Sequence, residues 1–197
     1  MEDNHYNYQK VKKKYLKFIS SQEVMSEPFR DKLKQLNKFY LPISKMIKDE
    51  YIKKKRTKVI GLTGGQGTGK STISNVLKII LKEAYKLETV IFSIDDFYKT
   101  FRERKKMSKR INSLFLTRGV PGTHDTKMLF QCIKSLKDNK FKKLTIPKFD
   151  KSIDNRSSKN KWLKIKKKPN IVIFEGWCVG ATAQKNKDLN FPINKLE

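Results

Sequence analysis

Eight consecutive residues, 64–71, have the types and spacing of a loop that binds phosphate groups. They read Gly-Gly-Gln-Gly-Thr-Gly-Lys-Ser and match the pattern G-x-x-x-x-G-K-[ST] at every fixed position. Glycines let such a loop turn its backbone N–H groups toward one anion, where a Cβ would block many of the necessary conformations. In this pattern Lys70 reaches the β- and γ-phosphates of a nucleotide and the Ser71 hydroxyl ligates Mg²⁺. The predicted nucleotide-binding residues are Gly64, Gly65, Gln66, Gly67, Thr68, Gly69, Lys70, Ser71 and Thr72.

Acidic residues follow two other hydrophobic segments directly. Asp95 and Asp96 come after 88–94, and Glu175 ends the run Ile-Val-Ile-Phe-Glu. A carboxylate facing a bound Mg–nucleotide can accept the proton of an acceptor hydroxyl or hold the metal through water. Adjacent side chains point in different directions, so we expect one aspartate to face the site and the other to cap or brace the next segment. Both could instead mark only the start of a helix.

A third polar cluster lies in the loop that runs from Arg118 to Asp125. Its sequence, Arg-Gly-Val-Pro-Gly-Thr-His-Asp, combines constrained residues with ligands for a polar or anionic substrate, His124 among them. Lys148 and Arg156 form a further cluster, and basic residues can clamp a carboxylate or a phosphate. A loop with one histidine can equally be structural, and a lysine in a lysine-rich loop can equally be solvated.

Hydrophobic segments and helical patterns alternate around these groups. Residues 58–63, 88–94 and 170–175 are expected to be buried strands, and 71–81 a helix with its apolar residues on one face. A basic helix is expected near 101–111, and Asp125 as the N-cap of a helix that runs to Lys137. This alternation predicts an α/β fold with a parallel sheet and helices on both faces. Ligands then lie beyond the carboxyl ends of the strands.

The flanking regions are less regular. Residues 8–56 have apolar residues at three- and four-residue spacing, which predicts two or three helices punctuated by Pro28 and Pro42. Residues 144–150 are expected to form a short strand or extended piece, and 151–168 a lysine-rich loop.

The net charge of +27 raises the question of a nucleic-acid partner. Residues 101–170 hold 22 basic and 5 acidic side chains, but lysine supplies 39 of the 46 basic groups of the chain. Base and phosphate recognition favours arginine, and aromatic residues interleaved with arginine are not evident. We therefore expect lysine-decorated solvated faces, and no specific nucleic-acid partner.

No apolar run is long enough to span a bilayer. The first residues, Met-Glu-Asp-Asn-His, carry two acids and lead into no apolar stretch, so a secretory or organellar leader is not expected. Cys132 and Cys178 form neither a disulfide framework nor a metal-ligand spacing. These features predict a cytoplasmic protein without a membrane partner.

Five segments between about residues 41 and 181 together resemble the plant- and fungal-type D-glycerate 3-kinase family. This family is similar to other P-loop kinases, including uridine kinase, phosphoribulokinase and pantothenate kinase. The segments are the phosphate loop, Ser93-Ile-Asp-Asp-Phe-Tyr98, Arg118-Gly-Val-Pro-Gly-Thr-His-Asp125, Pro147-Lys-Phe-Asp-Lys-Ser152 and Phe174-Glu-Gly-Trp-Cys-Val-Gly180. The third and fifth are specific, whereas the first is general to P-loop proteins.

The resemblance implies an enzyme that transfers the γ-phosphoryl group of ATP to the 3-hydroxyl of D-glycerate. ATP and Mg²⁺ are the implied cofactors. Asp95 would be the general base and Lys70 would stabilise charge on the transferring group, while Ser71 and Glu175 would hold Mg²⁺. The candidate residues for a glycerate-like acid are Arg118, His124, Asp125, Lys148 and Arg156, with Arg118 favoured because a carboxylate needs a cation.

The chain departs from the family after the Glu-Gly-Trp segment. Family members continue with further strands and a lid, whereas 22 residues follow Glu175 here. The sequence therefore predicts a helical extension over 1–56 and a partial kinase domain over 57–197. In related kinases the later strands cover the far side of the loop-bearing strand. Residues 58–63 are therefore expected to form an exposed edge open to self-association.

Two alternatives stay open at this point. The chain could be a nucleotide-binding module or degenerate fragment without turnover. It could also be a kinase for another acceptor, such as a nucleoside or pantothenate, since related folds phosphorylate acids, nucleosides and sugars.

Overall fold

The structure is a computed structural model that describes residues 7–24, 28–183 and 185–190. The first six and last seven residues of the two predicted domains lie outside this range. The helical elements are α1 (Tyr8–Ser21), α2 (Lys32–Gln35), η1 (Leu36–Tyr40), α3 (Leu41–Lys54), α4 (Lys70–Tyr85), η2 (Ile94–Phe97), α5 (Phe101–Arg110), η3 (Ser113–Leu116), α6 (Thr126–Lys137), η4 (Lys159–Lys161) and η5 (Asn186–Leu189). The strands are β1 (Lys58–Thr63), β2 (Thr89–Ser93), β3 (Leu144–Ile146), β4 (Phe149–Asp150), β5 (Asn155–Arg156), β6 (Leu163–Ile165) and β7 (Ile171–Gly176).

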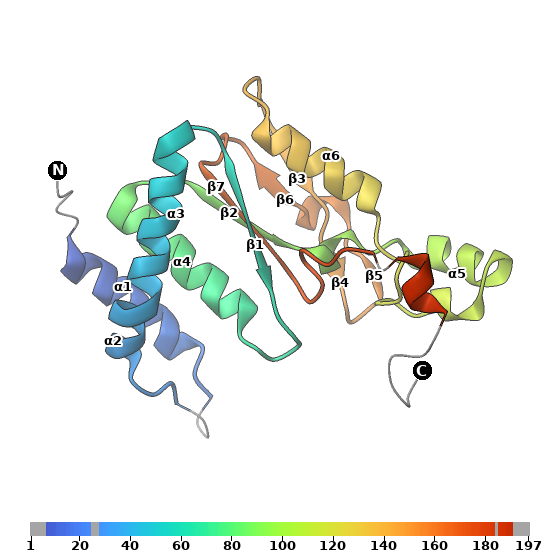
Figure 1. Ribbon diagram of the computed structural model, residues 1–197, viewed down its shortest axis with the longest axis horizontal. Coiled ribbons are helices and arrows are strands. Elements are labelled where there is room, and N and C mark those ends of the chain that lie inside the picture. Colours follow the sequence, from blue (N-terminus) through green and yellow to red (C-terminus); the bar gives the residue numbers. More distant parts are fainter. Residues whose placement is uncertain (1–6, 25–27, 184, 191–197) are drawn as a thin grey trace.

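The centre of the molecule is a parallel three-stranded sheet in the order β1-β7-β2 (Figure 1). Ile171 is in register with Lys58 on one side and with Thr89 on the other, so the three strands end at the same edge of the sheet. β7 pairs on both sides and is almost continuously buried, which explains its unbroken apolar sequence. The predicted parallel α/β sheet is confirmed.

Alternate residues of the strands face two separate cores, because successive strand side chains point to opposite faces. Ile171 and Ile173 pack against α3 and α4, with Leu77 and Leu81 from the latter. The opposite face, which includes Val172, packs against α6 and the strands β3 and β6. Helices therefore cover both faces of the sheet, as expected (Figure 1).

The N-terminal helices pack onto the outer side of α4. Val11 and Tyr15 of α1 are buried in one cluster with Val76 and Ile80 of α4. The carboxylate of Glu83, also on α4, pairs with lysines from α1. This region is consequently joined to the sheet layer through α4.

Pro28 lies between α1 and α2, whereas Pro42 lies in the first turn of α3, directly after the π-helical turn η1. Because the helical run continues through this point, a proline there lacks the N–H that would bond to the preceding turn, and the π-helical turn η1 lies directly before α3. α2, η1 and α3 follow one another directly in the chain, without an intervening loop.

The prediction of a lysine-rich loop over 151–168 is correct only in part, because β5, η4 and β6 lie within it. β4 pairs with β5 and β3 pairs with β6, each in an antiparallel arrangement. Ile165 of β6 is buried against the core beneath α6, while Lys164 next to it is exposed. The single apolar alternation of Leu-Lys-Ile is too short to stand out among the lysines, and only pairing with β3 reveals it.

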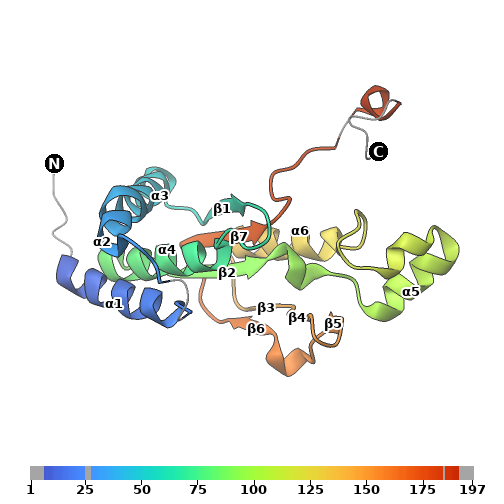
Figure 2. The ribbon, with the colours of Figure 1, turned by 90° about the horizontal axis from the view of Figure 1, so that it is seen from below.

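The order of the sheet places β1 at one edge, as the sequence predicts. Among the described residues no strand pairs with its outer side. In Figures 1 and 2, α5 and its connections project from the body of the molecule on the side opposite α1. None of the helices in the described ranges has the length and apolar character needed to cross a bilayer.

Candidate active site

The phosphate loop connects β1 to α4, as the sequence predicts. Gly67 and Gly69 have φ values of 79° and 75°, in the left-handed region that glycine adopts without strain. A Cβ at Gly64 would lie 2.8 Å from the Thr68 hydroxyl oxygen. That hydroxyl donates a 2.9 Å hydrogen bond to the carbonyl of Gly65. The loop conformation therefore requires the small residues that the pattern specifies.

The end of the loop is the N-terminus of α4, which begins at Lys70 and includes Ser71 and Thr72 in its first turn. The partial positive charge of this 16-residue helix favours an anion at that end. The Lys70 ammonium group donates to the carbonyl of Gly65, which keeps it beside the loop. Residues 65–69, including Gln66, are exposed. The loop and helix end offer a cradle whose donors match nucleotide phosphates.

Glu175 joins the end of β7 to the first turns of α4. Its Oε1 accepts a 2.8 Å hydrogen bond from the Ser71 hydroxyl, and its Oε2 accepts a 2.9 Å hydrogen bond from the Ser74 hydroxyl. The residue is only 8% exposed, so both oxygens depend on these donors. Ser74 is not among the residues predicted from the sequence, although its place one helical turn after Ser71 is a signal for a shared face.

A hydroxyl and a carboxylate in contact are the kinds of oxygen ligand that Mg²⁺ takes in phosphate sites. Ser71 and Glu175, predicted to hold the metal, are therefore placed together. Within the described ranges, no group of three or more His, Cys, Asp and Glu side chains could hold a metal ion. Mg²⁺ commonly keeps several waters and uses one or two protein ligands plus substrate phosphates, so this donor set fits it.

The two adjacent aspartates after β2 have different surroundings. Asp96 is 5% exposed and acts as a cap: its Oδ2 accepts the backbone N–H of Ser93 at 3.1 Å, completing a capping box around η2. Its Oδ1 lies 3.0 Å from the ammonium of Lys148. Asp96 is therefore the bracing member of the pair, and Lys148 forms its ion pair with this buried aspartate.

Asp95 is the more open member of the pair. Its side chain is 25% exposed and its Oδ2 lies 2.8 Å from the ammonium of Lys151. Because β1, β2 and β7 are parallel and in register, Asp95 follows the same sheet edge as the phosphate loop and Glu175. Lys148 is the lysine of this region predicted from the sequence to contact substrate. Lys151 is not among the predicted residues, because no residue spacing distinguishes it from its lysine neighbours.

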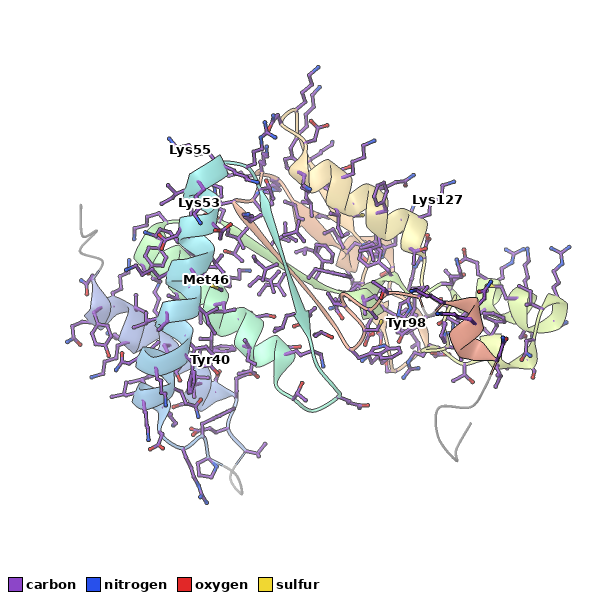
Figure 3. The ribbon with its side chains drawn as sticks, viewed as in Figure 1. Tyr40, Met46, Lys53, Lys55, Tyr98 and Lys127 are labelled. Atoms are coloured by element: carbon purple, nitrogen blue, oxygen red, sulfur yellow. The ribbon has the colours of Figure 1, made fainter. Side chains whose placement is uncertain are left out.

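Tyr98 and His124 form a buried stack beside Asp95. Their ring centroids are 4.2 Å apart at an interplanar angle of 23°, and the two residues form an isolated antiparallel bridge. Burial and the nearby Asp95 carboxylate raise the pKa of Tyr98 to about 12, so its hydroxyl keeps its proton. Burial also lowers the pKa of His124, which favours the neutral imidazole. Tyr98, labelled in Figure 3, lies where the sheet meets the projecting α5 segment.

The neutral imidazole has one hydrogen-bonding atom without a partner. His124 is 8% exposed, and its Nε2 is buried with no hydrogen-bond partner among the described residues. From the sequence, His124 is expected at the substrate; in the structure it stacks against Tyr98, and its contact with a substrate stays a prediction.

Arg118 belongs to an ion-pair cluster that the sequence analysis did not foresee. Its guanidinium lies 2.6 Å from Oδ1 of Asp154, whose Oδ2 lies 2.8 Å from the guanidinium of Arg104. Arg104 is fully buried and also donates to three backbone carbonyls. Arg118 is about one third exposed, so one side of its guanidinium is held while part of it stays open.

Asp125 and Arg156 satisfy each other inside the protein. Arg156 donates to the carbonyl of Tyr98 at 2.8 Å and to Oδ2 of Asp125 at 3.1 Å. Oδ1 of Asp125 accepts the backbone N–H of Met128 and caps α6, as the sequence predicts. These bonds give both residues structural roles, and their predicted contact with substrate stays a prediction.

A separate cleft of about 510 Å³ lies between β2 and the β6 region. Asp96, Lys148 and Trp162 are among its lining residues, but no residue of the phosphate loop is. It therefore lies behind the bracing aspartate.

Comparison with known proteins identifies relatives of this arrangement. A sequence model of the Phosphoribulokinase / Uridine kinase family matches residues 59–190. The chain is 37% identical over 130 residues to an uncharacterized kinase (mug58) of Schizosaccharomyces pombe, covering 62% of this chain and 46% of the relative. It is 30% identical over 130 residues to the chloroplastic D-glycerate 3-kinase of Arabidopsis thaliana, covering 62% of this chain and 28% of the relative.

Among solved structures, the D-glycerate 3-kinase of Cryptococcus neoformans var. grubii superposes with a TM-score of 0.67 and 27% identity. The superposition covers 76% of this chain and 56% of that one. The aligned part thus spans less than half of each of the two curated relatives.

Proposed function

The chain belongs to the phosphoribulokinase/uridine kinase family, and on that premise we propose that it is an ATP-dependent kinase for a small hydroxylated acceptor. The proposed acceptor is D-glycerate, with 3-phosphoglycerate as product. Two relatives named D-glycerate 3-kinase support this choice. The cation Lys151 beside Asp95 supports an acceptor that carries a carboxylate.

One observation carries the kinase proposal. The Ser71–Glu175 hydrogen bond joins the phosphate-loop helix to the end of β7, and Asp95 follows the end of the neighbouring strand. A donor cradle, a metal-binding pair and an open carboxylate thus share one edge of the sheet, where ligands bind in parallel α/β folds.

Each group has a distinct part in the proposed reaction. ATP with Mg²⁺ supplies the phosphoryl group when bound. The loop N–H groups and Lys70 hold the phosphates and offset the charge that develops on them. Ser71 and Glu175 hold the metal. Asp95 accepts the proton of the acceptor hydroxyl, and Asp96 keeps the turn that presents Asp95 in place.

The test is an assay of ADP release by the folded chain, with D-glycerate, uridine and pantothenate offered separately. We expect turnover that depends on D-glycerate and disappears in Lys70→Met. Turnover with uridine alone would refute D-glycerate as the acceptor but would support the proposal that the chain is a kinase. Binding of Mg–ATP without turnover on any acceptor would instead identify a nucleotide-binding module.

A further inference from the structure

Lys151 is set apart from the other lysines of its region by its partner. Its ammonium lies 2.8 Å from Oδ2 of Asp95, the proposed base, although the lysine side chain itself is 63% exposed. Lys148, three residues earlier, pairs with the buried cap Asp96 instead. The two lysines of the Lys-Phe-Asp-Lys segment thus serve different aspartates, and the second one reaches the open carboxylate.

The turn that carries Lys151 is anchored on both sides of it. The Asp150 carboxylate accepts hydrogen bonds from the backbone N–H and the hydroxyl of Ser152. Asp154 is held by Arg118 and by the buried Arg104. The position of Lys151 beside Asp95 therefore follows from a fastened β4–β5 turn.

An acceptor hydroxyl must come within hydrogen-bonding distance of Asp95 to lose its proton to that residue. The Lys151 ammonium lies beside the same carboxylate. It can therefore reach the part of a small acceptor molecule that lies close to the hydroxyl. Lysine carries its charge on a flexible four-carbon stem with three donors. It can therefore turn from Asp95 to an incoming anion while the turn stays in place.

We propose that Lys151 binds the carboxylate of the acceptor and so selects a small hydroxy acid over a neutral alcohol. This inference rests on the proposed kinase function and deepens it by naming the residue that recognises the carboxylate of the acceptor. In the absence of acceptor, Lys151 pairs with Asp95. When the acid binds, its carboxylate pairs with the Lys151 ammonium, and its hydroxyl lies within hydrogen-bonding distance of the Asp95 oxygen.

The test compares D-glycerate with glycerol, which has hydroxyls but lacks the carboxylate. The measured quantity is the ratio of kcat/KM for D-glycerate to kcat/KM for glycerol. In Lys151→Met we expect this ratio to fall roughly tenfold or more, the range for one lost hydrogen bond to a charged group. Lys151→Arg should recover most of the preference, and Lys159→Met, an exposed lysine in the nearby η4, should leave it unchanged.

A merely structural role for Lys151 would lower both kcat/KM values together, with a lower melting temperature, and would overturn the proposal. An unchanged ratio in Lys151→Met would overturn it too. If the wild-type chain turns over no acceptor, calorimetric titration with D-glycerate in the presence of Mg–ADP tests the role of Lys151 directly. Binding that weakens in Lys151→Met but not in Lys159→Met supports the proposal although kinase activity has failed. Absence of D-glycerate binding, or equal binding by both variants, refutes it even if another acceptor is phosphorylated.

Discussion

The adjacent aspartates at the end of β2 should differ in what the same substitution to asparagine reduces, stability at one and turnover at the other. Asp96 is nearly buried and holds the Ser93 N–H, whereas Asp95 is a quarter exposed and contacts one exposed lysine. Asn keeps the shape of Asp but replaces one acceptor oxygen with a donor. Asp96→Asn should therefore mainly destabilise the fold, and Asp95→Asn should mainly reduce turnover.

The magnitudes follow from the partners. A hydrogen bond to a charged group is worth about 1.5–3 kcal/mol. The Lys148–Asp96 pair adds little, because the lysine side chain is 58% exposed. We therefore expect Asp96→Asn to lower the free energy of unfolding by about 2 kcal/mol, which corresponds to a melting temperature lower by about 4–8 °C in a chain of this size. The Asp95–Lys151 pair is exposed at the lysine end, and exposed pairs contribute at most about 1 kcal/mol.

The assays are thermal unfolding and acceptor-dependent ADP release on both variants. General-base catalysis contributes about 10²–10⁴ in rate, so Asp95→Asn should lose turnover in that range while still binding Mg–ATP. Asp96→Asn, measured at a temperature where it is folded, should lose far less. The assignment is refuted if Asp95→Asn proves the less stable variant, or if Asp96→Asn alone loses turnover at constant melting temperature.

Two further predictions concern the framework of the site. Ser74→Ala leaves Oε2 of the buried Glu175 without its donor, so it should lower the free energy of unfolding by about 1–3 kcal/mol and weaken Mg–ATP binding. Urea unfolding measures the first quantity and calorimetry the second. Wild-type values for both would contradict this role of Ser74. Glu83→Gln should reduce stability at neutral pH, because hydrogen bonds from Lys14 and Lys10 of α1 hold the pKa of the Glu83 carboxyl below its ordinary value. A lowered folded-state pKa gives stability that is present above the ordinary pKa and is lost as the pH falls through the folded value. The difference in unfolding free energy between wild type and Glu83→Gln should therefore shrink below about pH 4, and a difference that grows on acidification would exclude this linkage.

Much of the fold could be predicted from local sequence because the signals are local. The apolar run before Glu175 indicates a buried strand, and the phosphate loop between an apolar segment and an amphipathic one indicates a strand–loop–helix unit. Asp125 could be assigned as the cap of α6 because capping bonds connect residues only three positions apart. The β5 and β6 ladders were missed because strands of two or three residues carry almost no periodic signal.

Within the candidate site, the chemistry of each group could be predicted but not its partner. A phosphate loop and acids at the ends of strands could be predicted, since these depend on residue type and order along the chain. The folded arrangement was needed to show that Asp96 is the cap and Asp95 the open carboxylate, and that Lys151 rather than Lys148 reaches Asp95. It was also needed to show that Arg118 and the buried Arg104 share Asp154. Ion pairs between residues some 36 to 56 positions apart depend on how the loops fold onto one another, which neither residue type nor spacing records.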